Sequence, residues 1–269
     1  MTDAATIDLT DPALYADGVP HEVFTELRRR APVHRHVTTR TRDGEPFAFW
    51  SVVAHDEIQH ANRDWQTFSA RHGPGLQPTE LDRQGVMIVS MDPPEHSRLR
   101  KLISAGFTPR MIGELEGSIV RRTAQVLDAI TERGECDFVR DVAYQLPMHV
   151  IADIVGIPDE DREWVFHRTD VVLRWLDPRS GLSQADRDDA QRELFEYAQA
   201  LGRSKREHPA DDIWTTLAHA EITGDDGETT SLTELELDLF FLILTLAGSE
   251  TTRNAISQGL VALLEHPDQ

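Results

Sequence analysis

Apolar side chains recur every three or four residues over most of the chain, which is the period of an amphipathic α-helix. This pattern predicts helices over residues 141–156, 160–176 and 185–207, and a longer helix from Met111 to Glu132. In the longer helix, the inner face is predicted to consist of Leu115, Ile119, Val126, Leu127 and Ile130. The sequence therefore predicts a mainly α-helical fold.

A β-hairpin region is predicted near the N-terminus. A short amphipathic helix ends before Pro32, since proline removes a backbone donor and disrupts a helix. From Val33 to Val53 the chain predicts two strands joined by a turn at Asp43-Gly44. A short helix is then expected over His55–Asn62, followed by an irregular stretch at residues 70–90 that is rich in glycine, proline and glutamine.

The last predicted helix is by far the longest. It begins at residues 232–234 and ends at residues 266–267, which corresponds to about 50 Å at 1.5 Å per residue. Its segment Leu239–Ala247 is apolar on all sides apart from one threonine, which predicts burial. Polar residues then occupy Gly248–Asn254. The helix could simply emerge into solvent at Ser249, but apolar periodicity resumes after Asn254, which favours a functional interruption.

The polar interruption is costly if it is buried. An unpaired buried carboxylate or hydroxyl costs several kcal/mol, and glycine costs roughly 1 kcal/mol in a helix interior. Gly248 would let another group approach the backbone, while Glu250 and Thr251 form a candidate acid–alcohol pair for proton transfer. Thr252 is the alternative hydroxyl, although it follows the acid by two residues rather than one.

A second candidate site lies on a helix expected to follow Pro93 and Pro94 and to end near Gly106. His96 and Arg100 are four residues apart and therefore share one face of that helix. Two donor groups in this arrangement suit a carboxylate or a phosphate. The alternative interpretation is a basic helix that faces solvent and binds nothing.

Composition narrows the classes of function. The 269 residues include 47 acids and 27 bases, and the net charge of −20 argues against nucleic-acid binding. No apolar run reaches the roughly 20 residues that a membrane span requires, and the first residues lack the features of a signal peptide. The single cysteine, Cys136, excludes an internal disulfide. These features predict a cytoplasmic protein.

Two segments resemble motifs of the cytochrome P450 haem-thiolate monooxygenases, and of bacterial members in particular. The first is similar to the oxygen-binding motif of the family's central helix and reads Ala247-Gly248-Ser249-Glu250-Thr251-Thr252. The second is similar to the helix whose histidine and arginine hold a haem propionate; it reads Met91-Asp92-Pro93-Pro94-Glu95-His96-Ser97-Arg98-Leu99-Arg100-Lys101, followed by Phe107-Thr108-Pro109-Arg110. Both motifs occur in the family's order, and the resemblance extends over essentially the whole chain.

The resemblance implies a haem-dependent monooxygenase that uses O2 and holds heme b as its cofactor. His96 and Arg100 would then bind a haem propionate, and Gly248, next to Ala247, would open a groove for dioxygen. Thr251 would hold the reduced oxygen species by hydrogen bonding, and Glu250 would relay protons from solvent.

The implied substrate is a hydrophobic small molecule such as a sterol, a terpenoid or a lipid. Its contacts are expected from residues 70–90, from the helices at 160–207, and from three apolar residues of the long helix: Phe241, Leu244 and Leu246. Electrons would come from a ferredoxin-type donor. Residues 96–113 contain no acid, so a cationic patch made of Arg98, Lys101 and Arg110 would steer an acidic partner. A solvated face with no partner is the alternative.

The resemblance also implies a C-terminal part that residues 1–269 do not contain. That part carries a Glu-x-x-Arg helix and the cysteine that binds the haem iron. Cys136 is not expected to replace this cysteine, because acidic neighbours oppose thiolate formation and it precedes the oxygen-binding motif. We therefore expect one truncated P450 domain without an axial metal ligand, inactive as a fragment. The alternative is a non-catalytic helical remnant that holds no haem.

Overall fold

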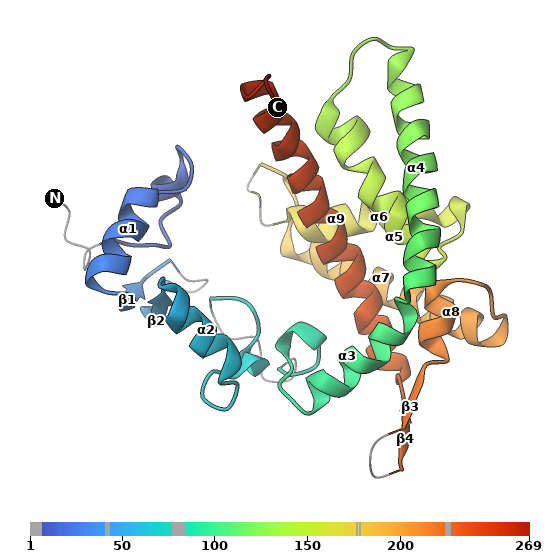
Figure 1. Ribbon diagram of the computed structural model, residues 1–269, viewed down its shortest axis with the longest axis horizontal. Coiled ribbons are helices and arrows are strands. Elements are labelled where there is room, and N and C mark those ends of the chain that lie inside the picture. Colours follow the sequence, from blue (N-terminus) through green and yellow to red (C-terminus); the bar gives the residue numbers. More distant parts are fainter. Residues whose placement is uncertain (1–6, 41–43, 77–83, 176, 178, 224–226) are drawn as a thin grey trace. The chain divides into compact units, whose positions relative to one another are not determined.

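The computed structural model describes residues 7–269 except 41–43, 77–83, 176, 178 and 224–226 (Figure 1). It divides into two compact units, Met1–His96 and Ser97–Gln269. Most described residues are helical, and the described strands form two small antiparallel pairs. The hydrophobic pattern therefore predicted the fold class correctly.

The first unit is built around the predicted hairpin. Strands β1 (Val33–Thr38) and β2 (Phe47–Val52) pair antiparallel, with Val33 opposite Val52. Helix α1 (His21–Arg30) precedes them and α2 (His55–Arg63) follows them. Asp43 of the predicted turn and residues 77–83 of the predicted irregular stretch lie outside the described residues.

The second unit is helical, and α9 contacts several of its other helices (Figure 1). The boundary between the units falls within the first turn of α3. The helices are α3 (Glu95–Gly106), α4 (Pro109–Thr131), α5 (Gln145–Val155), α6 (Asp159–Arg174), α7 (Gln184–Glu207), α8 (Ile213–Ala218) and α9 (Glu234–Glu265).

A second hairpin follows α8, and the hydrophobic pattern of the sequence does not predict it. It consists of β3 (Glu221–Thr223) and β4 (Thr229–Ser231), and Ile222 lies opposite Thr230. Strands of three residues are too short to show the alternation of apolar and polar positions by which a strand is predicted. This explains why the pattern missed them.

Two apolar positions of α4 differ from the prediction. Ile119 and Leu127, assigned to the inner face, are 39% and 43% exposed. Helix α4 packs mainly on α5 and on the π-helical turn Val139–Ala143 that precedes α5, so only a narrow stripe of α4 is covered, and Ser118 is the buried position there. The helical period predicted the helix correctly, but it predicted a wider buried face than the structure has.

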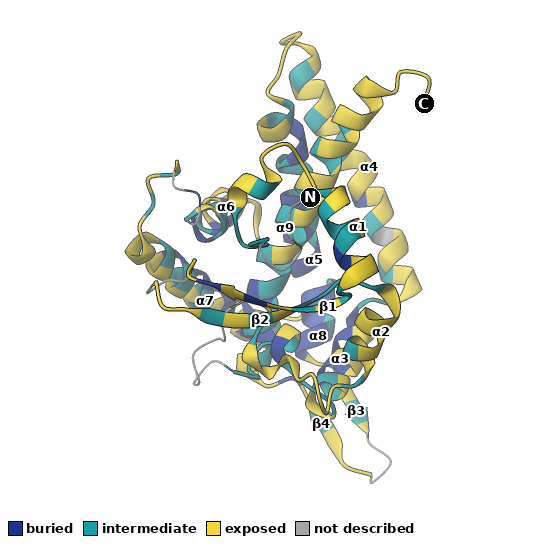
Figure 2. Ribbon diagram, turned by 90° about the vertical axis from the view of Figure 1, so that its left-hand side faces the viewer, coloured by how far each residue is buried: buried dark blue, intermediate teal, exposed yellow. Residues whose placement is uncertain are grey.

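Aromatic side chains fill the interior where α7, α8 and α9 meet. The Trp214 ring is fully buried, stacks on Phe240 at a centroid distance of 5.9 Å and meets Phe241 edge-on at 6.0 Å. Aromatic pairs at such distances stabilise a core beyond their buried area. Figure 2 shows buried residues concentrated on α5, α8 and the first half of α9, whereas the last turns of α9 are exposed.

Helix α9 begins and ends where the sequence indicates. The Thr233 side chain accepts a hydrogen bond from the Glu236 amide, and the Glu236 side chain accepts one from the Thr233 amide, which forms a capping box. His266 ends the helix. Asp238, two residues further along, is buried, and burial together with the neighbouring Glu234 raises its pKa to about 6.

Candidate functional site

The polar segment of α9 does not interrupt the helix. Each hydroxyl of the segment donates to a carbonyl one turn earlier: Thr251 Oγ1 to Ala247 O at 2.8 Å, Thr252 Oγ1 to Gly248 O at 2.9 Å, and Ser249 Oγ to Thr245 O at 2.6 Å. Such bonds satisfy the hydroxyls locally. Hydroxyl groups are therefore held at fixed positions on a continuous helix.

One face of α9 remains open beside this segment. Leu244, Ala247 and Thr251 lie three or four residues apart and therefore share that face. Ala247 and Thr251 are exposed, and Leu244 is half-buried. The structure thus brings together three of the residues singled out in the sequence.

The other two proposed substrate contacts lie elsewhere on α9. Phe241 is fully buried, and its ring contacts Trp214 and Tyr197. Leu246 is two residues from Leu244, and successive residues turn by about 100°, so it lies about 200° away around the helix. Of these three residues, only Leu244 shares the face of Thr251.

Gly248 permits a close approach of the kind predicted, and the approaching group is on α5. A Cβ atom at this position would lie 3.0 Å from Cδ1 of Ile151. This distance is tighter than ordinary van der Waals contact, so a larger residue would displace Ile151. In the described structure Gly248 therefore allows α5 and α9 to pack closely.

The Glu250 carboxylate lies near Arg253. Within the described part of the chain, it makes no hydrogen bond with the Thr251 hydroxyl. Its Oε1 lies 3.7 Å from Nη2 of Arg253, one turn later, and its side chain is 43% exposed. Nη1 of Arg253 lies 3.9 Å from Oδ1 of Asp170 on α6. The helix thus carries the acid and the hydroxyl next to each other in sequence but on different sides.

Helix α3 holds the predicted pair of donors. His96 is half-buried and Arg100 is exposed, and they are one turn apart on the helix. Within the described part of the chain, neither side chain has a hydrogen-bonding or ion-pair partner. Two donors without partners on one helix face are suited to an anionic group such as a haem propionate.

The three residues of the predicted cationic patch differ in their surroundings. Arg98 is held by Glu236 at the start of α9, and its Nη1 donates to Ser231 O at 3.4 Å. Arg110 forms an exposed ion pair of 3.5 Å with Asp211. Lys101 is exposed and makes no ion pair with any described residue. Arg98 therefore links α3 to α9, and Lys101 is the exposed charge of the three that forms no ion pair with a described residue.

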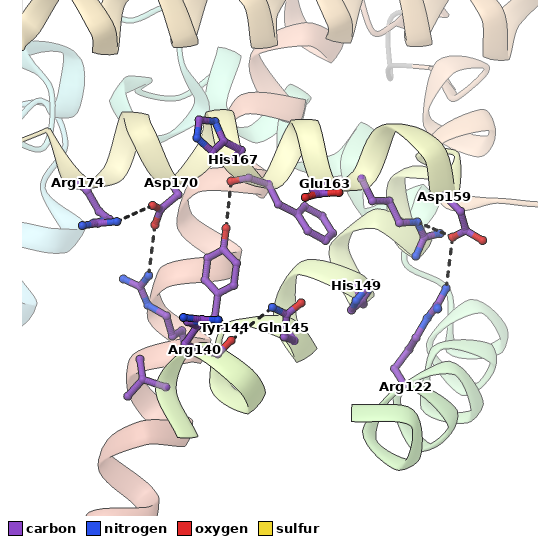
Figure 3. Close-up of a pocket in the computed structure, with 14 residues that line it drawn as sticks. Arg122, Arg140, Tyr144, Gln145, His149, Asp159, Glu163, His167, Asp170 and Arg174 are labelled. Atoms are coloured by element: carbon purple, nitrogen blue, oxygen red, sulfur yellow. Dashed lines mark hydrogen bonds and ion pairs between the residues drawn. The ribbon is translucent and has the colours of Figure 1, made fainter. Parts of the chain in front are cut away.

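A cavity of about 900 Å³ opens between α5 and α6, with one residue of α4 and one of α9 in its lining. Figure 3 shows Tyr144, His149 and Glu163 within it, and Asp170 joined to Arg174. Burial and the nearby Asp170 raise the pKa of Tyr144 to about 12. No pattern in the sequence predicted this cavity, because its residues come from segments that show only helical periodicity.

Asp153 is at the centre of a charge cluster in the second unit. Its carboxylate accepts 3.0 and 3.3 Å hydrogen bonds from Arg122 and another from Ser118, and it ion-pairs with Arg162 at 2.7 Å. Burial alone would raise the pKa of Asp153, but the donors outweigh it and lower the pKa to about 2. Since these residues come from three helices, the cluster fixes α4, α5 and α6 together.

The described residues fit a haem in two places. On α3, the donors His96 and Arg100 have no partner among the described residues and suit a propionate. On α9, Ala247 and Thr251 are accessible on the open face. No group of three or more histidine, cysteine or acidic residues that could hold a metal ion occurs among the described residues. Cys136 is exposed.

The chain is similar to known proteins of one family. The cytochrome P450 family profile matches residues 161–269. Cytochrome P450 126 of Mycobacterium tuberculosis is 40% identical over 279 aligned residues, which cover 100% of this chain and 66% of that protein. The steroid C26-monooxygenase of Rhodococcus jostii is 35% identical, over 97% of this chain and 56% of that protein. The structure of a Mycobacterium marinum cytochrome P450 in complex with pseudoionone superposes with a TM-score of 0.82 at 33% identity, covering 100% of this chain and 66% of that one.

The chain belongs to the cytochrome P450 family, whose members use a haem cofactor. It spans 66% or less of the length of these relatives. In the described part of the chain, no helix is both long enough and apolar enough to cross a membrane.

Proposed function

We propose that the protein is a haem-dependent monooxygenase that hydroxylates a hydrophobic small molecule with O2, in the cytoplasm, and that its two units are parts of one P450 domain. The observation that carries this proposal is the open face of α9, where Ala247 and Thr251 lie exposed directly beside the buried residues Thr245 and Ser249. When bound, the haem supplies the oxygen-activating chemistry.

The residues of this chain then have separate tasks. His96 and Arg100 hold a propionate by charge-assisted hydrogen bonds. Ala247 leaves space on the open face, with Gly248 beside it. The Thr251 hydroxyl, whose proton is donated to Ala247 O, would accept a hydrogen bond at the reacting oxygen, and Glu250 would pass protons from solvent. The alternative is a helical fragment that binds no haem. In that case, substitution of these residues changes neither haem content nor product yield.

The substrate is proposed to be a sterol, a terpenoid or a lipid. Leu244 supplies an apolar contact on the same face as Thr251. The relative from Rhodococcus jostii is named for a steroid substrate, and the M. marinum structure contains pseudoionone, which supports an apolar substrate class. Phe241 and Leu246 are proposed to shape the site indirectly, through the packing of α9.

The first test concerns the haem. Arg100→Ala in the full-length gene product should weaken haem binding by about tenfold, because a propionate would lose a charge-assisted hydrogen bond. The haem-to-protein ratio after gel filtration measures this loss. The control is Arg121→Ala, on the exposed side of α4. Equal haem content in the Arg100→Ala variant and the parent protein would remove Arg100 from the cofactor site.

The second test concerns the acid–alcohol pair. Thr251→Ala should preserve substrate binding and reduction while the yield of product per electron pair falls by about tenfold or more, since the hydrogen bond at the reacting oxygen is lost. Glu250→Gln should slow turnover and increase the solvent isotope effect. Thr252→Ala is the matched control, one residue further along the helix. If Thr252→Ala has the larger effect, the hydroxyl has been assigned to the wrong residue.

An acidic ferredoxin-type donor is proposed as the electron source, and Lys101 is its accessible contact. Lys101→Glu should slow reduction by this donor several-fold at low salt and much less at high salt, because exposed charges are screened beyond about 10 Å at 0.1 M. Reversing Arg192, which lies on an exposed face of α7, is the control. Equal slowing by Lys101→Glu at both salt concentrations would argue against electrostatic steering.

A further inference from the structure

Glu250 of α9 is connected to α6 by a series of contacts between oppositely charged side chains. Glu250 Oε1 lies 3.7 Å from Arg253 Nη2, and Arg253 Nη1 lies 3.9 Å from Asp170 Oδ1. Asp170 Oδ2 in turn accepts a hydrogen bond of 3.1 Å from Arg174. We propose that Asp170 and Arg253 are positioning residues that hold the Glu250 carboxylate in place for proton transfer. This inference rests on the proposed function, since the role of Glu250 is itself part of that proposal.

Glu250 needs an external constraint to adopt one position. Its side chain is 43% exposed, and Arg253 is its only partner among the described residues. A free glutamate on a helix surface samples several rotamers, and restricting them has an entropic cost. Proton transfer requires a donor within hydrogen-bonding reach of its acceptor, directly or through one water molecule. A fixed carboxylate therefore serves this role better than a mobile one.

Arg253 can provide that constraint only if it is itself held. An ion pair between residues three apart on a helix is weak when it stands alone. Arg253 is 18% exposed and Asp170 is 25% exposed, so their attraction is screened less than that of two surface groups. Because Asp170 belongs to α6, it fixes the guanidinium with respect to a second helix.

Arg253, which lines the cavity between α5 and α6, lies about 200° around α9 from Thr251. The cavity is therefore on the opposite side of α9 from the open face. Arg253 and Asp170 are part of the lining of this cavity, whereas Glu250 is not. Each proton that Glu250 gives up is replaced by one from solvent water, which its 43% exposed side chain can reach. The Arg253 guanidinium keeps its protons throughout and acts only by position.

The first experiment needs no haem. The heteronuclear NOE of the Arg253 Nε–Hε group, measured by NMR in the 269-residue chain, reports how firmly the guanidinium is held. Asp170→Asn should lower it to the value of Arg121, whose side chain is exposed and has no ion pair among the described residues. Asp170→Glu should restore it. Arg174→Gln is the matched control, because Arg174 shares Asp170 but does not contact Glu250.

The second experiment uses the haem-loaded full-length gene product. Asp170→Asn and Arg253→Gln should each lower product yield per electron pair by about threefold or more, since proton transfer is sensitive to geometry. Asp170→Glu should recover most of the yield, and Arg174→Gln should leave it unchanged.

The two experiments separate failure of this inference from failure of the proposed function. An unchanged NOE of Arg253 in Asp170→Asn, or equal effects of Asp170→Asn and Arg174→Gln on product yield, would overturn the positioning role. If the NOE falls as expected but the full-length protein forms no product with any substrate tested, the proposed function fails and the positioning role falls with it. If the NOE falls while the yield of Asp170→Asn matches the parent, the contact is structural only and the inference is wrong.

Discussion

Trp214→Ala is expected to destabilise the chain by about 4 kcal/mol, the largest loss that we predict for a single substitution. The indole is fully buried and packs against Phe240 and Phe241, so its removal leaves a cavity that three helices cannot close. Urea unfolding followed by circular dichroism measures the loss. A change below about 1 kcal/mol would show that this region is not a packed core.

Trp214→Phe is the informative comparison. The indole Nε1 is buried and has no hydrogen-bond partner in the described part of the chain, and an unsatisfied buried donor costs about 1–3 kcal/mol. Phenylalanine keeps most of the ring contacts and removes that donor. We therefore expect the free energy of unfolding of Trp214→Phe to lie within about 1.5 kcal/mol of the parent value. A loss as large as that of Trp214→Ala would indicate that the indole nitrogen has a bonding partner after all.

Asp153→Asn is expected to cost about 2–3 kcal/mol at pH 7. The substitution removes the negative charge that Arg122 and Arg162 share in the interior, and leaves the two half-buried guanidinium groups with only the exposed Asp159 as a common partner. Asp159→Asn is the matched control, because Asp159 contacts the same two arginines but its side chain is 80% exposed. Its effect should stay below about 1 kcal/mol, as for other exposed ion pairs.

The pH dependence of the Asp153→Asn effect has a definite sign. The pKa of Asp153 is lowered to about 2 in the folded chain from a usual value of 3.8, so ionised Asp153 stabilises the folded state. This stabilisation is fully present above pH 4 and disappears as the pH falls through 2. The difference in unfolding free energy between parent and Asp153→Asn should therefore shrink between pH 4 and pH 2. A difference that stayed constant over this range would contradict the charge-based explanation.

Local patterns were enough to predict the elements that carry the candidate site. The capping residues and the apolar run located α9, and spacing alone placed His96 and Arg100 on one face of α3. The polar residues inside the apolar pattern marked Glu250 and Thr251. Each of these inferences uses residues that are close together in sequence, where helix geometry fixes their relation.

The features that could not be predicted depend on pairing between distant segments. Asp170 and Arg253 are 83 residues apart in the sequence, and no local pattern indicates that α6 and α9 bring them within 3.9 Å. The same holds for Arg98, which was expected to be a free surface charge and instead pairs with Glu236. Helical periodicity shows which side chains are apolar, but it does not show which helix covers them, as Ile119 illustrates.

The most direct test of the account is the absorption spectrum of the full-length gene product after reduction and exposure to carbon monoxide. The account predicts the band of a thiolate-ligated haem, with a smaller amount of bound haem in Arg100→Ala and an unchanged amount in Arg121→Ala. A protein that binds no haem, or whose carbon monoxide complex lacks the thiolate band, would contradict the proposal that this chain contributes His96, Arg100, Glu250 and Thr251 to a haem monooxygenase.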